Sequence, residues 1–181
     1  MLSDFAKKKA RHLFDTYDAR HTGVLEREDY ELIAHRVALE QARAPGSRDH
    51  ERITHAFQTA FERMKAVADY SRDGRISPDE WEDLMEIVLS DQKAFEAIVG
   101  STVDLLFEMF DLDRSSTLDE RELARLRRVF GVPDDGGALF RALDENGDGV
   151  LSTIEVRHAI EQFFRSEDPS QPGNLFFGPL E

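Results

Sequence analysis

The sequence predicts an all-α protein built from two pairs of helix–loop–helix units, forming a compact two-lobed body with a docked C-terminal tail. Three observations predict this fold. Four acidic stretches share one spacing of oxygen-bearing residues, apolar residues flank them with the i, i+3, i+4 spacing of amphipathic helices, and Pro and Gly interrupt that spacing. A single unit cannot bury its own apolar face, so the four units are expected to pair.

Eight helices are expected. Ala44-Pro45-Gly46-Ser47 separates the second helix from the third, Pro78 lies in the first turn of the fourth, and Gly131-Val132-Pro133 ends the sixth. The expected helices lie near residues 3–17, 26–42, 49–67, 78–90, 92–110, 119–130, 135–143 and 152–165.

Apolar residues occupy matching positions on both sides of each acidic stretch. Their spacing places them on one helix face, so we expect them in the core and not around a cofactor. Before the stretches stand Phe14, Lys65 (with Met64 expected to take its place), Phe107 and Phe140. After them stand Tyr30, Trp81, Leu123 and Val156, followed by Ile33, Leu84, Leu126, Ala159 and Ile160.

The acidic stretches follow the ligand spacing that a hard cation such as Ca²⁺ requires. Ca²⁺ takes six to eight oxygens, which a twelve-residue loop supplies from side chains at positions 1, 3, 5 and 9, a carbonyl at position 7 and a bidentate carboxylate at position 12. Position 6 makes a sharp turn that favours glycine. Position 8 is apolar and pairs with its counterpart in a second loop.

The fourth and second stretches fit this pattern at every position. In the fourth, the candidate metal ligands are Asp144, Asn146, Asp148, Val150, Ser152 and Glu155, with Gly149 at the turn. In the second, they are Asp69, Ser71, Asp73, Arg75, Ser77 and Glu80, with Gly74 at the turn. Ser71 is neutral where Asp or Asn is usual, so the second loop carries one negative charge fewer.

The third stretch departs from the pattern only at its turn. Its candidate ligands are Asp111, Asp113, Ser115, Thr117, Asp119 and Glu122. Ser116 occupies position 6, where a positive φ costs a non-glycine residue about 1 kcal/mol. Asp119 at position 9 adds a carboxylate that compensates.

The first stretch is degraded. Its candidate ligands are Asp18, Thr22, Val24, Glu26 and Asp29. Arg20 places a positive charge where an oxygen is needed, and Asp29 is one methylene shorter than Glu. Gly23 and Leu25 are kept, so we expect the loop to keep its geometry but to bind an ion poorly; a smaller ion such as Mg²⁺ is favoured if one binds.

For every stretch the alternative is a solvated acidic turn. Four aligned copies, each with an apolar position 8 and an acid at position 12, argue against that alternative. We expect Leu25 to pair with Ile76, and Leu118 with Leu151. The predicted lobes are residues 1–90, with the degraded first and competent second loops, and 91–181, with the competent third and fourth loops and a tail at 168–181.

These features resemble a known family. Four helix–loop–helix units, a 51-residue spacing between the first two loop starts, Asp29 at the end of the first loop and a tail with Pro-Gly-Asn followed by aromatic residues are similar to the sarcoplasmic calcium-binding proteins of the EF-hand superfamily, nearest the bacterial branch typified by calerythrin. The resemblance implies a compact helical protein in which three of four loops hold Ca²⁺. Arg20 departs from it.

The composition argues against nucleic-acid and membrane partners. The chain of 181 residues has 23 Lys and Arg against 37 Asp and Glu, a net charge of −14, which opposes binding to nucleic acids and anionic lipids. No Cys is present, and no apolar run has the length of a membrane span. The first residues lack the apolar core of a signal peptide, so a cytoplasmic protein is expected. The basic run Lys7–Lys9 is expected on the solvated face of the first helix.

The favoured function is an intracellular Ca²⁺ buffer with about three occupied loops, with Mg²⁺ in competition. The alternative is a Ca²⁺ sensor that regulates a protein partner, but a promiscuous sensor has a Met-rich groove, and only Met64, Met85 and Met109 could serve here. An enzyme such as a photoprotein is disfavoured. The central cavity of a photoprotein is rich in Trp, Tyr and His, and this chain has only one Trp and three Tyr. A monomer is expected, and the sequence identifies no protein partner.

Residues 168–181 contain too much Pro and Gly for a long helix. Their large apolar side chains are costly to expose, at about 1.5–3 kcal/mol each. We therefore expect Leu175, Phe176, Phe177 and Leu180 to fill a groove in the protein itself, where a target helix would otherwise lie. The alternative is a frayed terminus.

Overall fold

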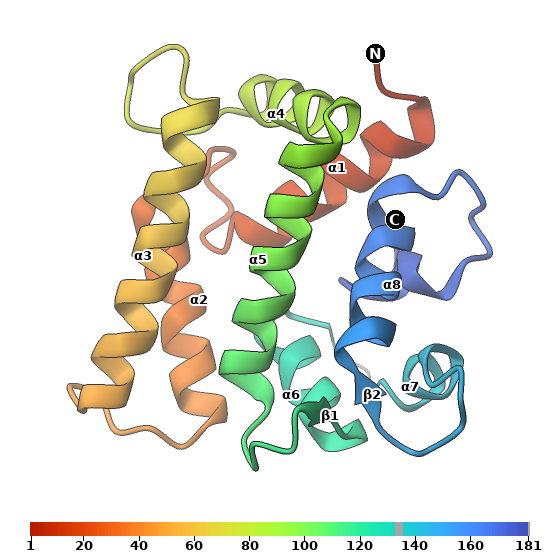
Figure 1. Ribbon diagram of the computed structural model, residues 1–181. Helices are drawn as coiled ribbons and strands as arrows, with labels where there is room; N and C mark the ends of the chain where they lie inside the picture. The colour runs from red at the N-terminus through yellow and green to blue at the C-terminus, as the bar shows by residue number, and fades with distance from the viewer. Residues whose placement is uncertain (133–135, 181) are drawn as a thin grey trace.

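The computed structural model describes residues 1–132 and 136–180, and the regular secondary structure of this part of the chain is almost entirely helical (Figure 1). The helices are α1 (Asp4–Tyr17), α2 (Arg27–Glu40), α3 (Arg48–Ala68), α4 (Pro78–Ser90), α5 (Gln92–Phe110), α6 (Glu120–Val129), α7 (Gly137–Leu143) and α8 (Thr153–Arg165), with strands β1 (Thr117–Leu118) and β2 (Leu151–Ser152) and a short 3₁₀ helix η1 (Pro172–Leu175). The all-α prediction is confirmed. Two predicted boundary features, Pro133 and the helix start at 135, lie outside the described residues.

Side-chain caps set where most of these helices begin. Ser3 accepts a hydrogen bond from the amide of Ala6 at 3.0 Å, and Asp91 accepts one from the amide of Lys93 at 2.7 Å. Such caps satisfy amides that have no partner within the helix. Because Asp91 alone separates α4 from α5, the chain turns sharply there, and α4 lies across one end of α5 (Figure 1).

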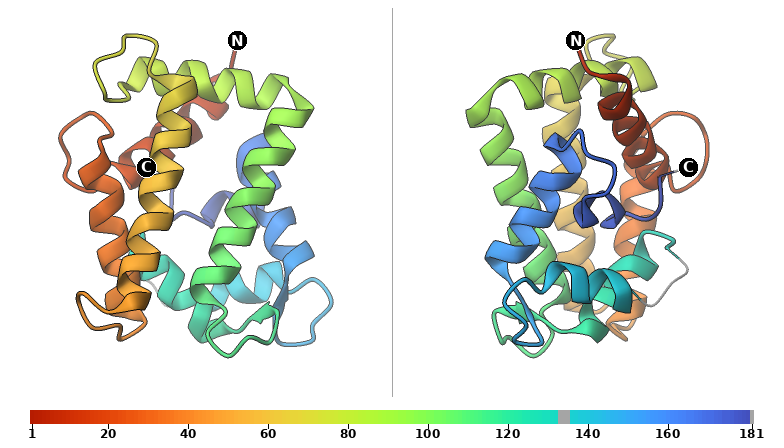
Figure 2. Two further views of the ribbon diagram at one scale, coloured as in Figure 1. Left: turned by 60° about the vertical axis from the view of Figure 1, so that its left-hand side comes forward. Right: turned by 90° about the vertical axis from the view of Figure 1, so that its right-hand side faces the viewer.

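The helices enclose one continuous apolar core. Helices α2 and α3 lie side by side, α5 packs against α4 and α8, and α1 crosses α4 (Figures 1 and 2). The predicted core residues are buried, except that Phe107 and Met64 are half-buried against the core. The Trp81 indole donates to the carbonyl of Ala10 at 2.8 Å, which ties α4 to α1. None of the described helices has the length and apolar character needed to cross a membrane.

The tail docks on the body, as predicted, but not through every residue expected. Helix η1 packs against α7 and α8, and it lies between α1 and α8 in Figure 2. Phe176 and Phe177 are 0% and 2% exposed, and Leu180 is partly buried. Leu175 is 45% exposed, so the prediction for its side chain was wrong. At this turn the backbone makes the contact instead, because Arg127 donates to the Leu175 carbonyl at 2.6 Å.

Lys9 also differs from the prediction. It was expected on a solvated face, but it is 2% exposed. Its ammonium group donates to the Ser166 carbonyl at 2.6 Å and lies 4.8 Å from the centre of the Phe5 ring. Burial lowers the pKa of Lys9. The buried amine thus satisfies a carbonyl at the C-terminal end of α8, where a positive charge is favourable.

Two glycine substitutions should have opposite effects on stability. A Cβ atom at Gly173 would lie 2.3 Å from the carbonyl oxygen of Ala159, so Gly173→Ala is expected to destabilise the protein by about 1–3 kcal/mol. At Gly100, inside α5, a Cβ atom would meet only the guanidinium of Arg157, at 3.5 Å. Gly100→Ala is therefore expected to stabilise by about 0.5–1 kcal/mol. Urea unfolding of both variants measures the difference, and equal effects would contradict the docking of η1 on α8.

Candidate metal centres

Each of the four loops runs directly into its second helix through a reciprocal cap. The residue at position 9 is the N-cap, and the acid at position 12 accepts a hydrogen bond from its backbone amide. These amide-to-carboxylate distances are 2.9 Å for Glu26–Asp29, 2.9 Å for Ser77–Glu80, 3.0 Å for Asp119–Glu122 and 2.8 Å for Ser152–Glu155. Every position-12 carboxylate therefore faces into its own loop.

The aspartate at position 1 closes each loop from the other side. It accepts hydrogen bonds from the amide at position 6, at 2.7 Å in Asp18, 3.0 Å in Asp69, 2.9 Å in Asp111 and 3.0 Å in Asp144. The turn needs a positive φ, which is +81° at Gly23, +87° at Gly74 and +85° at Gly149. Ser116 adopts +65°, the strained conformation predicted for it.

Buried carboxylates at position 12 are held in their charged form. Burial alone would raise the pKa of Glu80, but hydrogen bonds from Ser77 and Ser71 outweigh it and lower the pKa to about 2. In Glu155, burial also raises the pKa, but hydrogen bonds from Ser152 outweigh it and the pKa of Glu155 is lowered. Both groups are thus ionised at neutral pH, as a ligand for a divalent cation must be.

The third loop has the most convergent set of ligands. One oxygen each from Asp111, Asp113 and Glu122 lie within 4.8 Å of one another. Three carboxylates and the adjacent Asp119 match the all-oxygen, high-charge environment that Ca²⁺ prefers. The residues of this loop therefore fit a divalent cation.

The second and fourth loops have the same backbone frame with different side-chain contacts. In the second, the Arg75 guanidinium donates to Asp73 at 2.9 Å, so an arginine competes with any ion for this carboxylate. This pairing was missed by the sequence reasoning, which considered only the Arg75 carbonyl. In the fourth, the amide group of Asn146 donates to Asp148 at 3.0 Å. Both loops keep acids at positions 1, 5 and 12 and fit a cation.

The first loop does not fit a metal ion. The Arg20 guanidinium lies between Glu26 and Asp29 and forms hydrogen bonds with both carboxylates. The structure therefore brings Glu26 and Asp29 together around a side chain of the protein, whereas Asp18 accepts hydrogen bonds from the amides of Thr22 and Gly23. Thr22 donates from its hydroxyl to the Val24 carbonyl at 3.0 Å.

The loops are joined in pairs as predicted. Leu25 and Ile76 form an isolated antiparallel bridge with N–O distances of 2.9 and 3.0 Å. Leu118 pairs with Leu151 in the antiparallel sheet of β1 and β2. All four side chains are fully buried. Through these bridges the geometry of one loop of a pair depends on that of the other.

The strain at Ser116 gives a direct test of loop geometry. Ser116→Gly is expected to raise stability by up to about 1 kcal/mol, because glycine adopts the positive φ without steric cost. Ser115→Gly is the matched control and should destabilise, since the Ser115 hydroxyl contacts Thr117. Thermal unfolding in calcium measures both variants. A loss of stability in Ser116→Gly would contradict the strain.

Comparisons with known proteins agree with this geometry. An EF-hand family model matches residues 66–85 and 137–158, which contain the second and fourth loops. Calerythrin from Saccharopolyspora erythraea is 24% identical over 166 residues, covering 90% of this chain and 94% of its own. The sarcoplasmic calcium-binding protein beta chain from Penaeus sp. is 23% identical over 179 residues, covering 91% of each.

Solved structures share the fold at lower identity. A sarcoplasmic calcium-binding protein from amphioxus superposes with a TM-score of 0.77 at 19% identity, over 99% of each chain. The photoprotein clytin superposes with a TM-score of 0.71 at 16% identity, covering 98% of this chain and 95% of its own. The fold thus occurs in proteins with different activities, whereas the relatives found by sequence are calcium-binding proteins.

Proposed function

We propose that this chain, a calcium-binding EF-hand protein of the calerythrin and sarcoplasmic calcium-binding protein type, is a Ca²⁺ buffer. It binds three ions, one in each of the second, third and fourth loops, through the candidate ligands named above. The proposal includes competition by Mg²⁺, a monomeric state and a cytoplasmic location. The net charge of −14 supports the absence of nucleic-acid and membrane partners.

The docked tail is the observation that carries the buffer assignment. A sensor exposes an apolar groove when it binds Ca²⁺, and a target helix then occupies that groove. Here the tail places Phe176 and Phe177 in such a groove, where Phe177 contacts Phe163 with ring centres 4.9 Å apart. The backbone of the tail is held by Arg127 and by His12, whose Nε2 lies 3.0 Å from the Phe177 carbonyl oxygen. This occupation supports ion storage without target binding.

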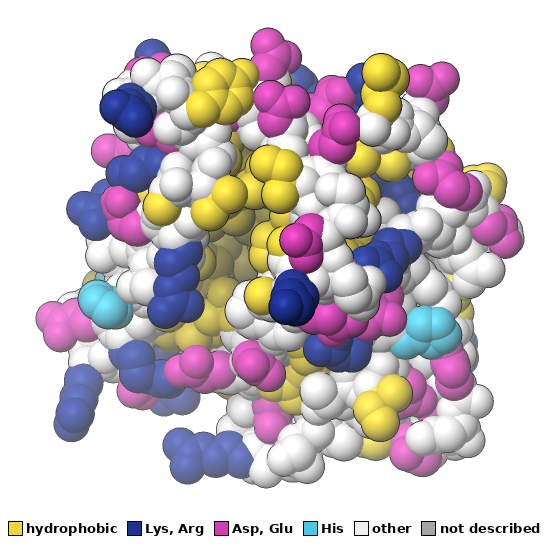
Figure 3. Space-filling model, turned by 45° about the horizontal axis from the view of Figure 1, so that its top comes forward, with side chains coloured by type: hydrophobic (Ala, Val, Ile, Leu, Met, Phe, Trp, Pro, Cys, Tyr) yellow, Lys and Arg dark blue, Asp and Glu magenta, His cyan; other side chains and the backbone are white. Residues whose placement is uncertain are grey.

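A sensor remains the second candidate because of a different surface. Figure 3 shows apolar side chains at the bottom of a hollow between α3 and α5. Met64 on α3 is only half-buried, and Tyr70, the second residue of the second loop, is 64% exposed. A partner that covers this surface in the Ca²⁺ form would make the protein a regulator.

Calcium titration calorimetry in the presence of magnesium, combined with small-angle scattering, tests the proposal. A buffer should bind three Ca²⁺ and keep the same scattering envelope at one and three bound ions. A large change in shape between these states would favour the sensor. Binding of no Ca²⁺ would refute both functions. Glu122→Gln should reduce the stoichiometry to two, because glutamine cannot supply a bidentate carboxylate at position 12.

A further inference from the structure

We propose that the guanidinium of Arg20 takes the place of a metal ion in the first loop, which is therefore closed by a cation of its own and binds no Ca²⁺. This inference rests on the proposed function, because it explains why the first loop holds no ion while the other three do. Arg20 is the third residue of its loop. The third residues of the other loops all carry side-chain oxygens: Ser71, Asp113 and Asn146.

The contacts of Arg20 reach the acids that an ion would bind. Nε donates to Oδ1 of Asp29 at 3.1 Å, and Nη2 donates to Oδ2 of the same carboxylate at 3.3 Å and also to Glu26. The backbone amides of Arg20 and Glu26 add hydrogen bonds of 3.1 and 2.9 Å to Asp29. Such a two-point guanidinium–carboxylate contact has strong geometric preference. Both oxygens of Asp29 are therefore engaged by N–H donors.

Burial of Asp29 makes its ion pair with Arg20 difficult to displace. Asp29 is 0% exposed, and the side chain of Arg20 is 31% exposed. The hydrogen bonds that Arg20 donates to Asp29 and then to Glu26 raise the pKa of Arg20, and arginine keeps its charge in proteins at any physiological pH. A metal ion that entered the loop would have to expel this charge or lie next to it. Separation of the pair would leave the buried Asp29 carboxylate uncompensated, which is unfavourable.

The first loop nevertheless has the frame of its metal-binding counterparts. Asp18 accepts hydrogen bonds from Thr22 and Gly23 at 2.9 and 2.7 Å, and the bridge from Leu25 to Ile76 is formed. Arg20 thus supplies the positive charge around which Glu26 and Asp29 gather. The second loop is consequently paired with a partner that needs no ion to be ordered.

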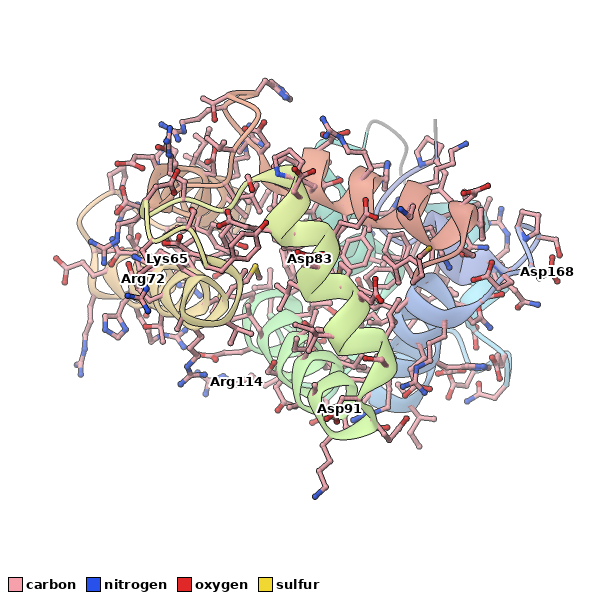
Figure 4. The ribbon with its side chains drawn as sticks, turned by 90° about the horizontal axis from the view of Figure 1, so that it is seen from above. Lys65, Arg72, Asp83, Asp91, Arg114 and Asp168 are labelled. Carbon is pink, nitrogen blue, oxygen red and sulfur yellow. The ribbon has the colours of Figure 1, made fainter. Side chains whose placement is uncertain are left out.

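Three variants test this assignment. Arg20→Gln removes the cation, Arg20→Asp combined with Asp29→Glu supplies an oxygen ligand at position 3 and a longer, bidentate acid at position 12, and Arg114→Gln is the control. Arg114 is an exposed arginine of the third loop, and it lies at the edge of the molecule in Figure 4. Equilibrium dialysis counts the bound Ca²⁺. We expect three ions in the wild type and in Arg114→Gln, and four in the double variant. Four ions in the wild type, or three in the double variant, would overturn the assignment.

Hydrogen exchange in calcium-free protein provides a readout that does not depend on metal binding. The Leu25 amide should exchange at least tenfold more slowly than those of Leu118 and Leu151, whose loops depend on ions, and Arg20→Gln should abolish this difference. Equal rates in the wild type, or slow Leu25 exchange in Arg20→Gln, would overturn the assignment. A protein that bound no Ca²⁺ but kept this Arg20-dependent protection would refute the proposed function alone.

Discussion

Removal of calcium is expected to lower the melting temperature on the order of 20 °C. An ion present at 100 times its Kd stabilises the folded state by about 2.7 kcal/mol, so three occupied loops contribute about 8 kcal/mol. For a chain of this size, each 1 kcal/mol shifts the melting temperature by about 2–4 °C. The acids of the third loop, Asp111, Asp113 and Glu122, would also repel one another without an ion. Differential scanning calorimetry with calcium and with a chelator measures the shift.

Two variants separate ion binding from general effects of charge. Substitution of Glu80, Glu122 and Glu155 by Gln should give a protein whose melting temperature is low and insensitive to calcium. Asp168→Asn is the control, because Asp168 is an exposed acid outside the loops, at the periphery in Figure 4. It should keep the full calcium response. A shift below about 5 °C in the wild type would contradict saturation of three loops.

Phe176→Ala should be the most destabilising single change in the tail. The side chain is fully buried and contacts Phe177 with ring centres 5.2 Å apart. Loss of a buried phenylalanine costs about 3–5 kcal/mol. The adjacent Leu175→Ala is the matched control, because Leu175 is 45% exposed and its substitution should cost less than about 1 kcal/mol. Urea unfolding in saturating calcium measures both variants.

The same pair tests what the tail covers. Phe176→Ala, and truncation after Ser166, should increase the binding of a hydrophobic dye to the calcium-saturated protein, whereas Leu175→Ala should not. Similar dye binding in all three would mean that the tail covers no groove, and the argument for a buffer would lose its support.

The ligand loops could be predicted because their geometry is local. Twelve consecutive residues contain the ligands, the turn and the apolar position 8, so the spacing, together with the expected pairing of the units, predicted the bridge of Leu25 to Ile76. The strain at Ser116 followed from the same template. Helix positions were predictable for a related reason, since apolar periodicity and Pro or Gly interruptions act over a few residues.

The contacts that sequence reasoning missed depend on the whole fold. Lys9 is buried because its amine reaches the Ser166 carbonyl, 157 residues away, and no local pattern marks that partner. Leu175 points outward because a 3₁₀ turn in a Pro- and Gly-containing segment has no apolar period that assigns its faces. The sequence placed Arg20 at a ligand position, but only the folded structure shows that its guanidinium contacts both Glu26 and Asp29.

The contacts between α1 and the segment after α8 affect the order of events during synthesis. Ser3 donates to Glu167, Lys9 to Ser166, and His12 contacts Phe177, so one helix binds three points that the ribosome makes more than 150 residues later. Until then α1 lacks these partners, and the Lys9 amine has to stay in water. Closing such long-range contacts late is slow. Completion of the fold around α1 is therefore a late step that begins only after this distant segment has been synthesised.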